Sequence, residues 1–393
     1  MEFLAWAGFR WIGKAIIVLA GLFSVIGGSV ANAQVDPHAT VEAKALHRKL
    51  FRLSRDFDHG KILYGHQNAF HEGRGWRLQS NSDASGELPE SDLHKATGLD
   101  PAVVGYDFGE IGAWNEDLMR HQMKEVHRRG GVVTLSWHMP NFNDAGVDSD
   151  AWNTSGETVH KILNDPGYRG LFLNRMDRLV AFLEKLKDVP MIFRPWHEHN
   201  YFWFWWGNTH CTPEEYKALW RLTVNHLWSK GIHQLLFAYS PNDIEKDYFE
   251  RYPGDSYVDV LGVDAYFKTA PENLYFFGLS PLDEWKRDVV TLLYWAESHH
   301  KIPAITEFGN EGIVYSKFWT DYYAWPMQRD GLIQFSKRIG VRAPSLKPAY
   351  ALLWRNDRDS PKHFYSPFPG APENENFLEL LKKGVLGFLG DLR

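Results

Sequence analysis

The sequence predicts an α/β protein that folds as one (β/α)8 barrel, or TIM barrel. Eight short apolar runs of strand length recur along the 393-residue chain, and most are separated by segments long enough for a helix. Runs with little internal charge are typical of parallel strands buried on both faces. Strand and helix alternating eight times predicts the barrel. The runs cover residues 62–64, 102–105, 132–136, 191–193, 235–238, 258–263, 302–306 and 350–353.

Helical periodicity is clear in two of the segments between these runs. Apolar residues recur at three- and four-residue steps over 171–187 and again over 214–230. Pro213, directly before the second segment, suits a first helical turn. A last helix is expected over 376–389, after a proline-rich stretch. The connections 66–101 and 240–257 fit less well, because the first has weak periodicity and the second is short, so a doubly wound open sheet is the alternative.

The placement of polar and aromatic residues favours the barrel over the open sheet. Such residues directly follow all eight runs. A barrel brings the carboxyl ends of all its strands to one rim, whereas an open sheet brings only the central few together. These residues include His66, Tyr106, Asp107, Trp137, His138, Arg194, His197, Glu198, Tyr239, Asn242, Asp264, Tyr266, Glu307, Trp354, Arg355 and Asn356.

The amino-terminal 33 residues resemble a secretory signal peptide. Arg10 and Lys14 precede an apolar run over residues 15–30, and Ala31-Asn32-Ala33 provides the small residues of a cleavage site. A membrane anchor is the alternative, but the run is short for a span and rich in glycine at its end. We expect cleavage after Ala33 and a secreted or periplasmic protein with no membrane attachment. Residues 35–393 are expected to form one domain, because no repeat or low-complexity linker divides them.

The composition argues against several classes of function. A formal net charge of −6 is unfavourable for binding nucleic acid. Neither a G-x-x-x-x-G-K-[ST] motif nor a strand-borne G-x-G-x-x-G motif is present, which argues against nucleotide binding. The single cysteine, Cys211, excludes an intramolecular disulfide and a cysteine-built metal site. The 17 tryptophans, several of them in polar contexts, indicate a surface on which rings stack.

Residues 191–207, MIFRPWHEHNYFWFWWG, form the most informative stretch. The apolar run ends at Arg194-Pro195, because proline cannot donate to a strand ladder. Glu198 follows, and then six consecutive aromatic residues that cannot all face one interior. A carboxyl group walled by aromatic rings keeps its proton near neutral pH, as the acid that cleaves a glycosidic bond must.

A second carboxylate, Glu307, follows the seventh run within Ile305-Thr306-Glu307-Phe308-Gly309. The fourth and seventh strands of an eight-stranded barrel face each other across its mouth. Two carboxyl groups across an aromatic groove are the apparatus of glycoside hydrolysis. One protonates the departing oxygen, and the other attacks the anomeric carbon or activates a water molecule.

Six motifs in strand order resemble those of family 26 glycoside hydrolases, whose best-known members are β-mannanases. They are LYGHQN, VGYDFG, RPWHEHNYFWFWWG, DAYF, ITEFGN and LLWRND, between about Leu63 and Asp357. The resemblance implies a (β/α)8 fold, a retaining mechanism, Glu198 as acid/base and Glu307 as nucleophile. The family also includes β-1,3-xylanases and mixed-linkage glucanases, so it does not fix the substrate. Where many relatives have glycine, this chain has Asn200-Tyr201-Phe202, and the groove is expected to differ there.

Seven further residues are candidates for binding the substrate. Arg194 is expected to lie near Glu307 and keep it ionised, and Tyr266 to donate a hydrogen bond either to Glu307 or to the region of the sugar ring oxygen. For His66, as for Tyr106 and Asp107, supporting the catalytic carboxylates is as good an interpretation as binding the substrate. Trp205 and Trp206 are expected to pack behind the groove. His197 is expected to contact the sugar 2-hydroxyl, and Trp203 and Trp354 to stack on sugar rings. His138 and His66 are expected to bind hydroxyls on the glycone side.

The sequence therefore predicts a secreted hydrolase that cleaves internal β-1,4-mannosidic linkages of mannan, glucomannan or galactomannan. The same groups acting on another β-glycan, exo-acting release of mannobiose, and a non-catalytic glycan-binding protein are the alternatives. A binding protein has no need for both Glu198 and Glu307. We expect no cofactor and no metal, because His197-Glu198-His199 lacks the H-E-x-x-H spacing of a helical zinc site. The expected partner is the polysaccharide, and the expected state is a monomer.

Overall fold

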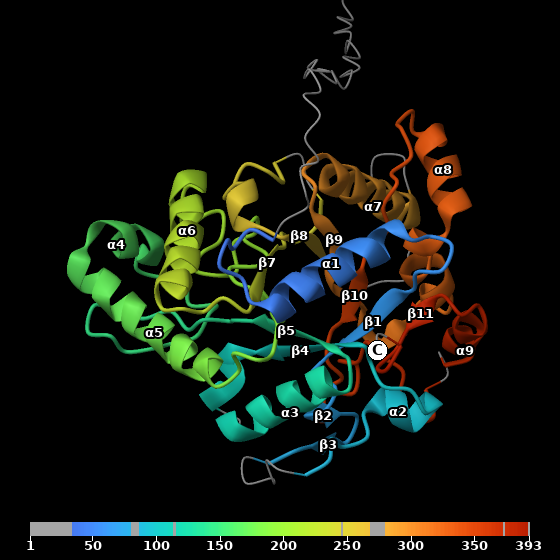
Figure 1. The fold of residues 1–393 in the computed structure, drawn as a ribbon, viewed down its shortest axis with the longest axis horizontal. Helices are drawn as coiled ribbons and strands as arrows, with labels where there is room; N and C mark the ends of the chain where they lie inside the picture. Colours follow the sequence, from blue (N-terminus) through green and yellow to red (C-terminus); the bar gives the residue numbers. More distant parts are fainter. Residues whose placement is uncertain are drawn as a thin grey trace, which may run out of the picture. The chain divides into compact units, whose positions relative to one another are not determined.

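The computed structural model contains a closed barrel of eight parallel strands, as the sequence predicts (Figure 1). It describes residues 34–79, 86–112, 115–244, 247–267, 280–371 and 374–391. Each strand pairs in parallel with the next in sequence order, and the last, β10, pairs with β1 to close the barrel, which excludes the open sheet. The strands are β1 (Ile62–Gln67), β4 (Val103–Asp107), β5 (Val132–Ser136), β6 (Met191–Arg194), β7 (Leu235–Tyr239), β8 (Val260–Phe267), β9 (Ile302–Asn310) and β10 (Tyr350–Leu353).

Helices surround the barrel (Figure 1), and they begin where the sequence provides caps. In α6, the Thr212 hydroxyl accepts a hydrogen bond from the backbone of Glu215, and the Glu215 carboxylate accepts one from the backbone of Thr212. The predicted segments 171–187 and 214–230 correspond to α5 and α6. The helices are α1 (Val41–Arg55), α2 (Asp92–Thr97), α3 (Glu116–Arg128), α4 (Thr158–Asn164), α5 (Pro166–Glu184), α6 (Pro213–Ser229), α7 (Pro281–Ser298), α8 (Arg329–Arg338) and α9 (Asn374–Lys382).

The amino-terminal end of the barrel is closed by α1. Leu46, Leu50 and Phe51 of this helix belong to one apolar cluster with residues from the first or second position of all eight barrel strands, such as Val103 and Ile302. This cluster seals one end of the barrel. The opposite end, where the strands finish, is therefore the end at which a site forms.

Three predicted elements differ from the structure. The connection after β1 contains a short hairpin, β2 (Glu72–Gly73) and β3 (Trp76–Arg77), followed by α2. The expected sixth strand over 258–263 begins later and continues to Phe267. The expected last helix over 376–389 is wrong beyond Lys382, because the chain turns at Gly384 (φ 66°) and forms β11 (Leu386–Gly387), which pairs with β1.

Residues Asn32–Arg393 group as one compact unit. The predicted signal peptide, residues 1–33, lies outside the described residues. Across the portion that the structure describes, none of the helices combines the length and apolar character that crossing a bilayer requires.

Candidate active site

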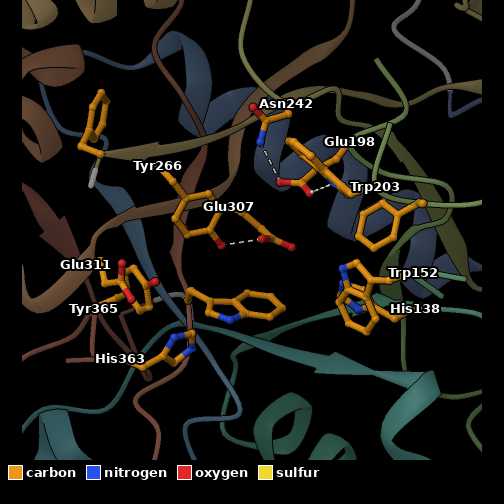
Figure 2. Close-up of a pocket in the computed structure, with 13 residues that line it drawn as sticks. His138, Trp152, Glu198, Trp203, Asn242, Tyr266, Glu307, Glu311, His363 and Tyr365 are labelled. Carbon is orange, nitrogen blue, oxygen red and sulfur yellow. Dashed lines mark hydrogen bonds between the residues drawn. The ribbon is translucent and has the colours of Figure 1, made fainter. Parts of the chain in front are cut away.

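A cleft of about 490 Å³ lies at the carboxyl end of the barrel (Figure 2). Its lining combines Glu198 and Glu307 with several aromatic rings, and it comes from the carboxyl-terminal parts of β8 and β9 and from segments that follow β5, β6, β7, β9 and β10. Of the predicted site residues, the structure brings Glu198, Glu307, His138, Trp203, Tyr266 and Trp354 to this cleft. The full lining is His138, Trp152, Glu198, Trp203, Phe204, Asn242, Tyr266, Phe267, Glu307, Glu311, Trp354, His363 and Tyr365.

Glu198 reaches the cleft through an unusual backbone. After β6 ends, Trp196 and Glu198 adopt φ values of 50° and 51°, a region that residues other than glycine rarely occupy. Such conformations persist only where the surrounding structure enforces them, and they concentrate at functional sites. Here the backbone N–H of Glu198 donates to the carbonyl of Ser240 at 2.8 Å, and buried Trp196 anchors the turn.

The Glu198 carboxyl group is hydrogen-bonded at both oxygens, and its pKa is nevertheless raised. Trp203 Nε1 donates to Oε2 and Asn242 Nδ2 donates to Oε1, each at 2.8 Å. Burial and the negative charge of Glu307 nevertheless raise the pKa of Glu198 to about 7, because they outweigh these two donors. A carboxyl group with such a pKa can act as an acid at neutral pH.

Glu307 lies inside β9, and a β-bulge directs it to the cleft. The pairing of β8 with β9 shifts between Val263 and Asp264, which leaves Thr306 as an extra residue just before Glu307. The Tyr266 hydroxyl donates to Glu307 Oε2 at 2.5 Å, and Arg194 Nη2 donates to Oε1. Sequence reasoning predicted both of these contacts.

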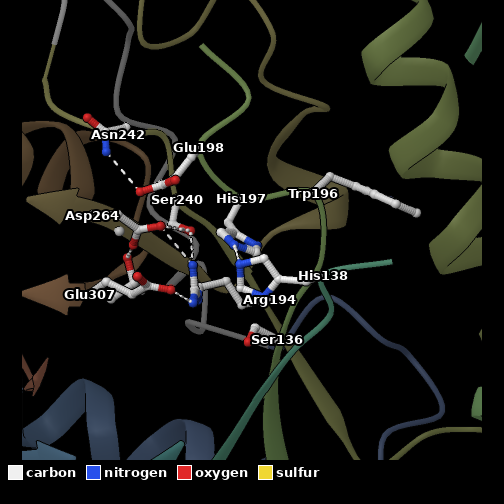
Figure 3. Close-up of polar contacts among 12 residues, drawn as sticks. Ser136, His138, Arg194, Trp196, His197, Glu198, Ser240, Asn242, Asp264 and Glu307 are labelled. Atoms are coloured by element: carbon white, nitrogen blue, oxygen red, sulfur yellow. Dashed lines mark hydrogen bonds and ion pairs between the residues drawn. The ribbon is translucent and has the colours of Figure 1, made fainter. Parts of the chain in front are cut away.

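Arg194 joins Glu307 to a third carboxylate, Asp264 (Figure 3). Asp264 is fully buried and accepts hydrogen bonds from Arg194 Nη1 and from the Thr306 hydroxyl, both at 2.7 Å. Oxygen atoms of Glu198, Asp264 and Glu307 all lie within 4.8 Å of one another. The guanidinium group of Arg194 supplies positive charge to this cluster. The sequence identified Asp264 only as a residue at a strand end, because its role depends on the pairing of β8 with β9.

His138, which lines the cleft, contacts His197, which is buried behind it. His138 Nδ1 bonds Asp107 Oδ2 at 2.7 Å, and its Nε2 lies 3.1 Å from His197 Nε2. Burial alone would lower the pKa of His138, but Asp107 outweighs burial and raises it. Burial, Arg194 and His138 together hold the pKa of His197 well below its usual value. These shifts favour the protonated form of His138 and the neutral form of His197.

Three predicted substrate-binding residues are buried away from the cleft lining. Arg194 and His197 are each 1% exposed, and they contact Glu307 and His138, respectively. His66 has no exposed surface and its ring nitrogens have no hydrogen-bond partner among the described residues. His66 lies within β1, is fully buried and does not line the cleft, so the expected position at the cleft surface is wrong.

The aromatic residues divide into cleft and core. Trp205 and Trp206 are buried, as predicted, whereas Trp203 and Trp354 line the cleft. Trp152 also lines the cleft, although it was not predicted to do so; it is 59% exposed and stacks on the ring of His138, with the ring centroids 5.5 Å apart. A tryptophan in the polar stretch Asp148–Ser155 was a signal that could have identified it. Other cleft residues that were not assigned roles are Phe204, Asn242, Phe267, Glu311, His363 and Tyr365.

Comparisons with known proteins agree on one family. The model of the family described as glycosyl hydrolase family 26 matches residues 35–331. The chain is 31% identical over 381 residues to a mannan endo-1,4-β-mannosidase of Bifidobacterium adolescentis, which covers 90% of this chain and 36% of that protein. It is 32% identical over 211 residues to one of Bacillus subtilis, with 47% of this chain and 55% of that protein covered. The chain thus spans less than two thirds of either curated relative.

Solved structures show the same relationship. A family 26 β-mannanase from Bacteroides ovatus superposes with a TM-score of 0.73 at 31% sequence identity, covering 89% of this chain and 96% of that chain. The catalytic domain of an endo-β-1,4-mannanase from a Bacillus species superposes equally well, with a TM-score of 0.73 at 28% identity, covering 91% and 94%.

Proposed function

Because the chain belongs to glycosyl hydrolase family 26, we propose that it hydrolyses internal β-1,4-mannosidic bonds of mannan, glucomannan or galactomannan with retention of configuration. The observation that carries this proposal is the pair Glu198 and Glu307. One carboxylate oxygen of Glu198 lies within 4.8 Å of one of Glu307 in an aromatic cleft, and the surroundings of the two groups differ. Two carboxyl groups in different environments are the mark of an acid and a nucleophile.

In the first step, the Glu307 carboxylate attacks the anomeric carbon of the sugar. The glycosidic C–O bond breaks as Glu198 transfers its proton to the departing oxygen, so the leaving sugar is released as an alcohol. Arg194 and Tyr266 hold the Glu307 oxygens by hydrogen bonds, which orients the attacking lone pair. A covalent glycosyl ester of Glu307 results.

In the second step, Glu198 acts as a base. Once Glu307 is esterified its negative charge is gone, so one cause of the raised pKa of Glu198 is removed. Ionised Glu198 then removes a proton from water, which attacks the anomeric carbon and releases Glu307. Retaining enzymes hold the two carboxyl groups about 5–5.5 Å apart, and inverting enzymes about 6.5–9.5 Å. The approach of the oxygens to within 4.8 Å favours retention.

The names of the relatives and the aromatic lining support mannan as substrate. Trp203 and Trp354 line the cleft near the two carboxylates, and sugar rings stack their C–H faces on such side chains. Both curated relatives are described as mannan endo-1,4-β-mannosidases. The alternatives are another β-glycan and exo-acting release of mannobiose.

Product analysis tests the proposal. We expect mannohexaose to give products of several lengths, and mannan viscosity to fall early, before many reducing ends appear. β-1,3-Xylan and mixed-linkage glucan should be cleaved much more slowly than mannan. Mannobiose as the sole early product would indicate exo action, and faster cleavage of either other glycan would contradict the substrate assignment.

We also propose that the protein is secreted, because its sequence carries a predicted signal peptide. The predicted cleavage site lies directly before Gln34, the first residue that the structure describes. The measurement is amino-terminal sequencing of the protein recovered outside the cytoplasm. It should begin at Gln34, and retention of residues 1–33 would contradict cleavage. Size-exclusion chromatography should find a monomer.

A further inference from the structure

Asn200 lies two residues after Glu198 and bonds to the backbone of Asn242 through both ends of its side-chain amide. Its Oδ1 accepts from the backbone N–H of Asn242 at 2.8 Å, and its Nδ2 donates to the carbonyl of Asn242 at 2.5 Å. A planar amide that offers a donor and an acceptor side by side presents the same groups as the backbone of an adjacent strand. The Asn200 side chain thus pairs with residue 242 as a strand would.

No residue of β6 pairs with Asn242, because β6 ends before that point. β6 pairs with β7 from Met191 to Phe193, and β6 stops at Arg194. On its other side, Asn242 forms an isolated parallel bridge with Asp264 of β8. The backbone of Asn242 is therefore fixed between β8 and the amide of Asn200, beyond the end of β7.

This fixed backbone carries a side chain that reaches the proposed acid. Asn242 Nδ2 donates to Glu198 Oε1 at 2.8 Å, and Figure 3 shows this bond. The same two loops are tied a second time, by the Tyr201 hydroxyl and Asp243 Oδ2 at 3.2 Å. Asn200 itself does not line the cleft.

We propose that Asn200 is a positioning residue for the acid/base: it fixes the loop after β7, so that Asn242 holds the Glu198 carboxyl group in the orientation that protonates the leaving oxygen. This assignment rests on the proposed function, and it gives a role to the first residue of the stretch Asn200-Tyr201-Phe202. A positioning role differs from a merely structural one in its consequences: removing the Asn200 side chain should impair acid catalysis and leave substrate binding unchanged.

The first test compares two substrates of the Asn200→Ala variant. With mannan, whose sugar leaving group needs a proton, kcat should fall about tenfold or more while KM changes little, since positioned acid catalysis contributes about 10²–10⁴-fold. With an aryl β-mannobioside that has a good leaving group, the rate of the first step should stay within about threefold of wild type. Equal losses on both substrates, or a change confined to KM, would overturn the proposal.

A pH profile supplies an independent reading of the same variant. The Asn242 hydrogen bond stabilises the anion of Glu198, so loosening it disfavours the anion. The alkaline limb of kcat/KM should move to higher pH by about half a unit, the equivalent of a weakened hydrogen bond. An unchanged or lower midpoint would contradict the proposal.

A double-mutant cycle shows whether Asn200 acts through Asn242. Asn242→Ala should reproduce the substrate pattern of Asn200→Ala with a larger loss, and the double variant should lose no more than Asn242→Ala alone. Fully multiplicative losses would mean that the two residues act independently, which would overturn the proposal.

Asn208→Ala is the matched control, because it is the same substitution in the same loop. Asn208 Nδ2 donates to the carbonyl of Asn200 at 2.5 Å and makes no bond to Asn242. We expect Asn208→Ala to show wild-type selectivity between the two substrates. A selective loss equal to that of Asn200→Ala would attribute the effect to the general order of the loop.

Near-UV circular dichroism checks that each variant is folded. Wild-type enzyme that cleaves no β-mannan would contradict the proposed function, whereas active wild type with an unselective Asn200→Ala would contradict this inference alone.

Discussion

Glu198 and Glu307 carry the same side chain, and their surroundings give them different roles. Glu198 receives neutral donors from Trp203 and Asn242, whereas Glu307 receives the guanidinium group of Arg194 and the hydroxyl of Tyr266. The sequence allowed both carboxylates to be identified, because each follows a strand within a distinctive motif. It could not predict the buried position of His66, because that depends on where β1 ends.

Glu198→Ala should affect substrates according to their leaving groups. Hydrolysis of mannan should be almost abolished, whereas an activated aryl mannobioside needs little protonation and should still form the glycosyl ester. The second step then lacks its base, so a burst and a low KM are expected. Azide needs no base and should restore turnover, giving a β-glycosyl azide that NMR identifies.

Adding azide to Glu307→Ala provides the comparison with Glu198→Ala. Azide in place of the lost nucleophile should yield, at most, the α-azide, and turnover of mannan should fall by several orders of magnitude. A β-azide from Glu307→Ala together with an α-azide from Glu198→Ala would reverse the two roles.

The pH dependence of kcat/KM should follow the protonation of Glu198. Burial and the charge of Glu307 disfavour its anion and raise its pKa to about 7, so the acid form persists up to that pH. Above about pH 7, kcat/KM should fall tenfold for each pH unit, because the first step then lacks its acid. The profile should be measured on mannan from pH 5 to pH 9. A midpoint near 4.5, the ordinary value for a glutamate, would show that Glu198 is not the acid.

At the scale of elements, the loop after β5 presents Trp152 to the cleft, and one buried residue organises it. Asn141 Nδ2 donates to the carbonyls of Asn153 and Ser155, at 2.6 and 2.9 Å, and its Oδ1 accepts from the hydroxyl of Thr158 at 2.6 Å. Helices such as α5 and α6 could be predicted from periodicity, but this loop could not, since its order comes from contacts of one side chain with residues 12 to 17 positions away.

Asn141→Ala should loosen this loop. Two backbone carbonyls lose their donor, so the free energy of unfolding should fall by about 1–3 kcal/mol. KM for mannan should rise as Trp152 loses its fixed position, with kcat nearly unchanged because the carboxylates are untouched. Urea unfolding and steady-state kinetics measure the two effects. Val147→Ala, at a side chain of the same loop that is 61% exposed, is the control and should have little effect on either quantity.

The wrong prediction for the last helix has a physical explanation. Apolar residues continue at helical spacing past Lys382, with Val385, Leu386 and Phe388. Gly384 adopts a positive φ and ends the helix, after which the chain pairs with β1. A glycine following two lysines is a helix-stop signal that was available in the sequence. The pairing with β1 was not, because it joins residues more than 300 positions apart.

At the scale of the whole molecule, the residues that form the cleft and the segments that close the rest of the barrel lie in different places. The carboxyl ends of the strands carry the cleft, while α1 and the chain around β11 cover other parts of the barrel. The alternation of apolar runs and helices predicted a parallel α/β architecture, because each strand needs burial on both faces. The polar and aromatic residues that follow all eight runs then favoured the barrel over the open sheet. The two connections that fitted poorly, after β1 and β7, contain little regular helix in their described residues.

Phe388→Ala tests the contribution of the carboxyl-terminal segment. Phe388 is 8% exposed and its ring lies 5.7 Å from that of Tyr64 in β1. Removing a buried ring of this size should lower the free energy of unfolding by about 3–5 kcal/mol. The kcat of the folded variant should stay close to wild type, since the cleft is at the other end of the strand. Leu378→Ala, at a side chain that is 43% exposed, should change stability by less than about 0.5 kcal/mol. Equal destabilisation by both would contradict this account of the segment.

The stereochemistry of the first product tests the central claim most directly. If Glu198 and Glu307 act by double displacement, proton NMR recorded during the first minutes of hydrolysis should show the β-anomer forming first, with the α-anomer appearing only as the sugar mutarotates. An α-anomer as the first product would mean that water attacks the β-linked sugar directly, which would contradict the assignment of Glu307 as nucleophile.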